Sequence, residues 1–185
     1  MVTTILLAAL IAQATVYRID PASCEAGFDL KATAHTVHKS TTSVTGEVSV
    51  VPDETGVLTF AGKISVGAAA LDTGNAKRDE TLHSKSLLVA SFPTIELAPE
   101  RFTPSGPATA DGSVAGQLTG QLTIRGQTRP QTIAATLRAR DGRIVATGTF
   151  DVAWPEFGVP DPSFFVVRVE KVAHARFRAE FVPVP

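Results

Sequence analysis

The sequence predicts an all-β domain with one short helical insert, and two patterns carry this prediction. Apolar and polar residues alternate with period two along most of the chain, which is typical of strands with one solvent-exposed face and one buried face. One segment, residues 71–93, interrupts the alternation with a charged, helix-like stretch. About eight antiparallel strands are expected, joined mostly by turns rich in Gly, Pro, Asp and Asn.

The first residues, 1–14, predict a secretory signal peptide. Residues 5–11 are apolar and uncharged, and the Ala-Gln-Ala that ends at Ala14 is a small-x-small cleavage site. The alternative is an N-terminal strand or tail, because no Lys or Arg precedes the apolar run. Residues 15–185 then form a single domain in a periplasmic or secreted protein.

Composition and motifs narrow the class of function. The formal net charge is −1, so the chain offers no basic field for nucleic acid. Cys24 is the single cysteine, which excludes an intramolecular disulfide and indicates a small structural residue. The sequence has no Gly-x-Ser-x-Gly elbow, phosphate loop or His-Glu-x-x-His helix. We therefore predict a binding protein without a cofactor rather than an enzyme.

Alternation is clearest in five segments and weaker in three more. The clear strands are predicted at 26–34, 58–66, 114–124, 144–154 and 175–181, and the weaker ones at 44–51, 93–102 and 132–140. Eight antiparallel strands can close into a barrel or pair into a sandwich.

Small residues in the inward phase favour a barrel with space inside it. They are Gly46, Gly62, Gly116, Gly120, Ala135, Ala139, Ala146, Gly148, Ala175 and Ala179. An eight-stranded barrel is about the size that holds one small ligand, although small residues also let sheets pack closely or bend. No charged residue lies in the inward phase of the five clear strands, which predicts an apolar, lipid-like guest.

The interrupting segment predicts a short helix. Asn75 can act as its N-cap, with acidic residues in the following turns, and the helix is expected from 76 to about 85. Its apolar side is narrow, which suits a cap over a barrel mouth. Arg78 and Asp79 are expected either to pair with a strand or, for Arg78, to hold a polar head group.

Several ordered motifs run from Tyr17 to near the end of the chain. They are Tyr17-x-Ile19-Asp20-Pro21, Asp72-Thr73-Gly74-Asn75, Arg78-Asp79, Leu82, Ser84, Phe92-Pro93-Thr94, Gly120-x-Leu122-x-Ile124-x-Gly126-x-Thr128-x-Pro130 and Phe157-Gly158. With them the sequence resembles the YceI-like family. The resemblance implies a secreted, extended, eight-stranded antiparallel lipocalin-like β-barrel whose lumen holds a polyisoprenoid or other long-chain amphiphile.

Two segments depart from the pattern that the resemblance implies. Trp154-Pro155-Glu156 replaces an Arg-Ser-Asp-like stretch before Phe-Gly, and Leu87-Leu88-Val89 replaces an aromatic-Asp pair. Both segments are expected at the mouth or lumen, so ligand preference is where this chain should differ from its relatives.

The predicted ligand is an isoprenoid or fatty-acyl lipid, and the predicted contacts are inward apolar residues with one arginine. These ligand-binding residues are Phe28, Leu30, Phe60, Ile64, Arg78, Leu82, Leu87, Leu122, Ile124, Phe150, Trp154 and Phe177. A homodimer and a membrane-associated protein partner are both compatible with the sequence.

The histidines give an alternative hypothesis. His35 and His38 fall in a predicted loop, and His83 lies on the predicted helix. Three imidazoles could hold zinc or another metal in a metal-binding enzyme or accessory protein. The simpler interpretation is that these side chains are solvated or bonded to backbone carbonyls, and no metal site is predicted.

Overall fold

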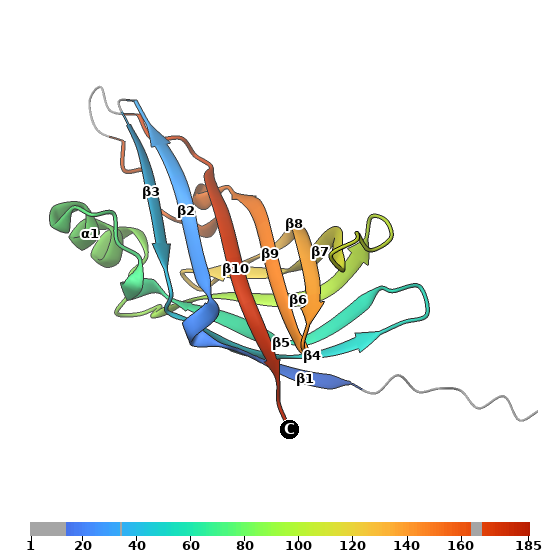
Figure 1. The fold of residues 1–185 in the computed structure, drawn as a ribbon. Helices are drawn as coiled ribbons and strands as arrows, with labels where there is room; N and C mark the ends of the chain where they lie inside the picture. Colours follow the sequence, from blue (N-terminus) through green and yellow to red (C-terminus); the bar gives the residue numbers. More distant parts are fainter. Residues whose placement is uncertain (1–13, 34, 164–167) are drawn as a thin grey trace, which may run out of the picture.

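The chain folds into a closed antiparallel β-barrel (Figure 1). The structure is a computed structural model that describes residues 14–33, 35–163 and 168–185. Within this part, ten strands form one sheet in the order β1-β4-β5-β6-β7-β8-β9-β10-β2-β3, and β1 also pairs with β10 to close the ring. The strands are β1 (Thr15–Ile19), β2 (Glu25–Ala32), β3 (His35–Thr41), β4 (Val44–Pro52), β5 (Leu58–Gly67), β6 (Thr94–Pro104), β7 (Ser113–Ile124), β8 (Gln127–Arg140), β9 (Arg143–Val152) and β10 (Ala173–Pro183).

β1 and β2 lie one after the other along β10. Ile19 of β1 is opposite Phe181, and Glu25 of β2 is opposite Arg178. The short turn η1 (Pro21–Ser23) separates the two strands. The hairpin of β2 and β3 therefore extends the wall upward beside β10, as Figure 1 shows. In the described part of the chain the closed ring consists of β1 and β4 to β10, which are eight strands, and β2 and β3 are added to it. The predicted eight-stranded barrel with a short helical insert is therefore confirmed.

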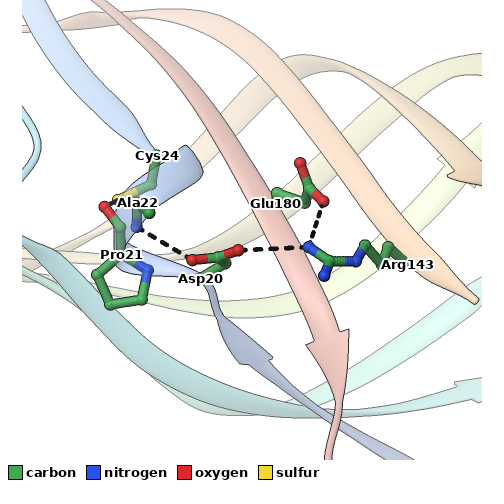
Figure 2. A network of polar contacts seen from close by, with 6 residues as sticks. All are labelled: Asp20, Pro21, Ala22, Cys24, Arg143 and Glu180. Atoms are coloured by element: carbon green, nitrogen blue, oxygen red, sulfur yellow. Dashed lines mark hydrogen bonds and ion pairs between the residues drawn. The ribbon is translucent and has the colours of Figure 1, made fainter.

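A polar network fixes the bend between β1 and β2 (Figure 2). The guanidinium of Arg143 donates to Glu180 Oε1 at 2.8 Å and to Asp20 Oδ2 at 3.3 Å, which ties β9 and β10 to the end of β1. Cys24 is buried beside it, with its Sγ 3.4 Å from the carbonyl oxygen of Pro21. Burial raises the pKa of this thiol. Cys24 is thus a small buried residue, as its isolation in the sequence indicated.

Several strand boundaries differ from the prediction, and β1 and β3 are strands that it did not include. β9 ends at Val152, before a 3₁₀ turn, η4 (Trp154–Phe157), in which Pro155 has no N–H to continue a ladder. The segment that contains His35 and His38 forms β3, where a loop was expected. That loop prediction was wrong because the segment holds too few apolar residues to alternate, although its backbone pairs fully with β2.

Small inward residues either allow close packing or leave an internal space, and two glycines show the close packing. A Cβ on Gly148 would lie 2.5 Å from the ring of Phe177, and one on Gly116 would lie 2.6 Å from the ring of Phe102. Aromatic rings therefore fill the space that these two glycines leave. Close packing and an internal space, the two alternatives from the sequence, both occur at different positions of the barrel.

The insert between β5 and β6 begins as predicted but ends differently. It contains η2 (Ala68–Ala70), the helix α1 (Ala76–Thr81) and η3 (Leu82–Ser86). Asn75 caps α1 by accepting a hydrogen bond from the Arg78 backbone N–H at 3.1 Å. After Thr81 the chain widens into a π-helical turn, in which the Leu87 N–H donates to the Leu82 carbonyl at 2.8 Å.

α1 does not itself cover the interior. It has no buried residue and lies to the side of β3 in Figure 1. Leu71 before it and Leu87 after it are both buried against the barrel. The flanks of the insert, rather than its helix, therefore approach the mouth. No helix in the described part of the chain is long and apolar enough to cross a membrane.

The turn between β6 and β7 makes stability depend on pH. Hydrogen bonds from Thr109 and Ser113 lower the pKa of Asp111 from 3.8 to about 2. Because the pKa in the folded state lies below that of the unfolded chain, the carboxylate stabilises the fold above about pH 4, and this contribution is lost between about pH 4 and pH 2. Asp111→Asn should therefore lower Tm near neutral pH, and the difference from wild type should shrink in acid.

Thermal melts at several pH values check this expectation. Asp141→Asn is the matched control, because Asp141 also occupies a hairpin turn but is highly exposed. A constant difference in Tm between wild type and Asp111→Asn down to about pH 2 would contradict the assigned role of the carboxylate.

Candidate functional site

In the part of the chain that the structure describes, the barrel surrounds an apolar cavity of about 320 Å³. This volume lies within the range of roughly 300–1,000 Å³ that small-molecule sites occupy. Every strand of the closed ring contributes to its wall, and β2 adds Phe28 and Leu30 above the ring. Ala135, Ala146 and Ala175 line it where larger residues would close it. The alanines thus supply the internal space that the sequence predicted.

Almost all of the predicted ligand-binding residues meet at this wall. Eight of them come from strands far apart in the sequence, and β-sheet alternation turns these eight inward. Leu82, Leu87 and Trp154 instead come from the insert and from η4. The predicted residues that line the cavity are Phe28, Leu30, Phe60, Ile64, Leu82, Leu87, Leu122, Ile124, Phe150, Trp154 and Phe177.

Arg78 is the exception, since it does not line the cavity. Its Nη2 donates to the Thr73 carbonyl at 3.0 Å, and its Nε donates to Thr73 Oγ1 at 3.2 Å. Hydrogen bonds from Thr73, first from its side chain and then from its backbone N–H at 2.6 Å, hold the pKa of Asp79 below the usual range. These contacts fold Arg78 back onto the loop that precedes α1, so the structure does not bring it to the lumen with the other predicted residues.

Sequence reasoning missed several wall residues. Leu97, Leu118 and Leu137 follow the same alternation as their neighbours and could have been found from it. Val159 and Pro162 come from the irregular segment after η4, where no periodicity marks them. Both departures from the family pattern do reach the cavity, through Leu87 and Trp154.

The charged residues beside the cavity have outward side chains. On β10, Arg176 and Arg178 alternate with Phe177, and Arg178 is opposite Glu25 on the same outer face. Arg176 pairs with Asp29 at 2.5 Å. The inward phase therefore stays uncharged, as predicted, and the wall is suited to a guest that is apolar along most of its length.

The histidines do not come together among the described residues. His83 Nε2 lies 2.7 Å from the Leu71 carbonyl oxygen, a backbone contact of the kind that the simpler interpretation expected. The side chains of His35 and His38 lie outside the described residues, as does most of the predicted signal peptide. Across the ranges that the structure describes, no group of three or more His, Cys, Asp or Glu residues is arranged to hold a metal ion.

A closed ring of antiparallel strands around an apolar lumen defines this protein as a lipocalin-like β-barrel. The family model for the YceI-like domain matches residues 17–181. The chain belongs to the YceI-like family. No curated protein matches the sequence.

Solved structures agree on the fold. Burkholderia cenocepacia BcnA has a TM-score of 0.70 at 15% identity, over 88% of this chain and 98% of its own. A polyisoprenoid-binding domain from Saccharophagus degradans, implicated in plant cell wall breakdown, has a TM-score of 0.66 at 10% identity, over 92% and 99%. A mutant Campylobacter jejuni YceI protein has a TM-score of 0.51 at 13% identity, over 75% and 80%. At these identities the likeness concerns the fold alone.

Proposed function

We propose that this protein is a carrier that encloses a polyisoprenoid or another long-chain apolar amphiphile in the barrel lumen. The observation that carries the proposal is the wall itself, which is apolar from Tyr17 at one end to Leu82 and Leu87 at the other. Each methylene buried against such a wall contributes about 0.8 kcal/mol. A chain with about ten buried methylenes would gain roughly 8 kcal/mol before the costs of association.

The comparisons support this choice of ligand class. The Saccharophagus degradans relative is a polyisoprenoid-binding domain, and the present chain covers nearly all of it. An isoprenoid chain is long, flexible and apolar, which matches a narrow lumen lined by Phe, Leu, Ile and Val. We carry this ligand class over as the leading candidate, with fatty-acyl chains as the second.

The proposal includes a place and a mode of action. We place the carrier in the periplasm or outside the cell, on the predicted signal peptide and the family membership. Its role is binding rather than catalysis, because the cavity wall presents no inward acid, base or cysteine nucleophile in the described residues. A homodimer and a membrane-associated protein partner stay predictions from the sequence.

Extraction of the purified protein with organic solvent tests the proposal. We expect mass spectrometry to find a long-chain lipid in about equimolar amount, because an apolar lumen of this kind should retain its guest during purification. Protein stripped of lipid should then take up an added isoprenoid and gain thermal stability, since a ligand that binds only the folded state stabilises it. A protein that is empty when purified and ignores both isoprenoid and fatty-acyl lipids would contradict the proposal.

A further inference from the structure

Ser86 stands apart from the other polar residues of the lumen. It lines the cavity and is only 7% exposed. Its side chain has no hydrogen bond to any residue that the structure describes. Yet every fully sealed side-chain nitrogen and oxygen in the described chain has a partner. The Ser86 hydroxyl is therefore not fully enclosed by protein atoms, and the residue borders the cavity.

The other polar groups at the described wall are already engaged, lie at the opposite end or, like Glu25, Arg176 and Arg178, are in the outward phase of their strands. Trp154 Nε1 donates to the Glu170 carbonyl at 2.8 Å. Tyr17 belongs to the opposite end of the barrel, where it pairs with Pro183 and is half-buried. Among the described residues, Ser86 is thus the deeply buried hydroxyl that the protein leaves open to a guest.

The π-helical turn explains how a serine comes to face the lumen. Ser84 lies in the same turn but does not line the lumen, and its Oγ donates to the Glu80 carbonyl at 2.6 Å. Lys85 is exposed. The wider turn that ends at Leu87 then brings two successive residues, Ser86 and Leu87, to buried positions at the cavity wall. π-Helical turns occur frequently at functional sites.

We infer that Ser86 is a hydrogen-bonding subsite that selects an apolar chain carrying a neutral hydroxyl or carbonyl group. This inference rests on the proposed function and specifies its ligand. A buried hydroxyl without a partner is unfavourable, and a ligand with a matching group removes that cost whereas a hydrocarbon does not. The two arginines that border the cavity, Arg176 and Arg178, lie in the outward phase of β10, and Arg176 is paired with Asp29. Burying an anionic head group beside Ser86 without an inward cation is therefore costly.

Competition with one fluorescent long-chain probe tests the subsite. Three competitors share one prenyl chain and differ only at the end, as an alcohol, a hydrocarbon and a monophosphate. Wild-type protein should bind the alcohol about 3–10-fold more tightly than the hydrocarbon. Ser86→Ala should bring that ratio to about one without weakening hydrocarbon binding, because it removes only the hydrogen bond.

Two variants serve as controls. Ser84→Ala removes a hydroxyl from the same turn but outside the lumen, so it should keep the wild-type ratio. Ser86→Thr keeps a hydroxyl and should retain a preference for the alcohol. Ser86→Ala should melt at or above the wild-type temperature, because it deletes an unpaired buried hydroxyl.

The outcomes separate this inference from the proposed function. Three results would overturn the subsite but not the lipid carrier. They are equal affinities of wild type for the alcohol and the hydrocarbon, an unchanged alcohol-to-hydrocarbon affinity ratio in Ser86→Ala, and a preference of wild type for the monophosphate. Failure of the probe and of all three competitors to bind would overturn the carrier itself.

Discussion

Replacing Ala146 with phenylalanine should weaken lipid binding at least about tenfold while leaving the barrel folded. Ala146 is in the inward phase of β9, lines the cavity and is 7% exposed. Across the sheet it is opposite Leu137 and Ala179, both of which also line the lumen. A phenyl ring here projects into the space that the ligand would occupy, so we expect affinity for an isoprenoid to fall at least about tenfold, which corresponds to roughly 1.4 kcal/mol.

The sign of the stability change tests whether the lumen is hollow. Adding a large side chain to a close-packed core destabilises a protein by about 1–3 kcal/mol. In a hollow barrel the same ring gains apolar contacts without displacing its neighbours, so the lipid-free Ala146→Phe protein should melt at or above the temperature of lipid-free wild type. Denaturation and lipid binding are measured on the same stripped preparations.

The matched control lies on the same strand. Thr149 is in the outward phase of β9 and is exposed, so Thr149→Phe adds the same ring outside the barrel. It should bind lipid like wild type. Equal loss of binding in both variants, or unimpaired binding in Ala146→Phe, would show that the cavity does not hold the ligand.

Most strands of the barrel and their inward faces could be predicted from the sequence, because such a strand has one solvent-exposed face and one buried face. In β7, Leu118, Leu122 and Ile124 are buried and alternate with polar residues, and this pattern alone gives the strand and its inward face. Asn75 was identified as an N-cap for a similarly local reason, since a cap depends on the backbone within three residues of it.

Features that depend on distant contacts were not available from the sequence. In the described ranges, β3 lies at one end of the sheet order beside β2, and its polar sequence gave no alternation to detect. The position of Arg78 depends on the path of the loop around Thr73, which no periodic pattern specifies. Val159 and Pro162 reach the lumen from irregular chain for the same reason.

Ser86 shows a different limit of sequence reasoning. A regular helix to about residue 85 was expected, but the π-helical turn changes which side chains face inward after Leu82. One extra residue in a turn redirects every following side chain, and residue spacing alone does not reveal it. The polar feature that most affects the proposed ligand was therefore visible only in three dimensions.

Phe102→Ala should be among the most destabilising single substitutions in this protein. Phe102 is 1% exposed and packs with Leu118, Ile133 and Ala135 in a cluster between β6, β7 and β8. Its ring lies over Gly116, where a Cβ would approach it to 2.6 Å. Removing a fully buried phenyl ring leaves a cavity and costs about 3–5 kcal/mol, which lowers Tm by roughly 6–20 °C in a chain of this size.

Phe60→Ala provides the comparison that gives this result its meaning. Phe60 is half-buried and lines the lumen, whereas Phe102 does not line it. Because its ring already borders empty space, truncating Phe60 loses fewer contacts and should lower Tm much less than truncating Phe102. Lipid binding should respond in the opposite order, with Phe60→Ala weakening it and folded Phe102→Ala retaining it. Chemical denaturation of both variants measures the stability effect, and binding of the fluorescent probe measures the effect on the lumen. Equal losses of stability in the two variants would mean that the barrel interior is not divided into a packed wall and an open lumen.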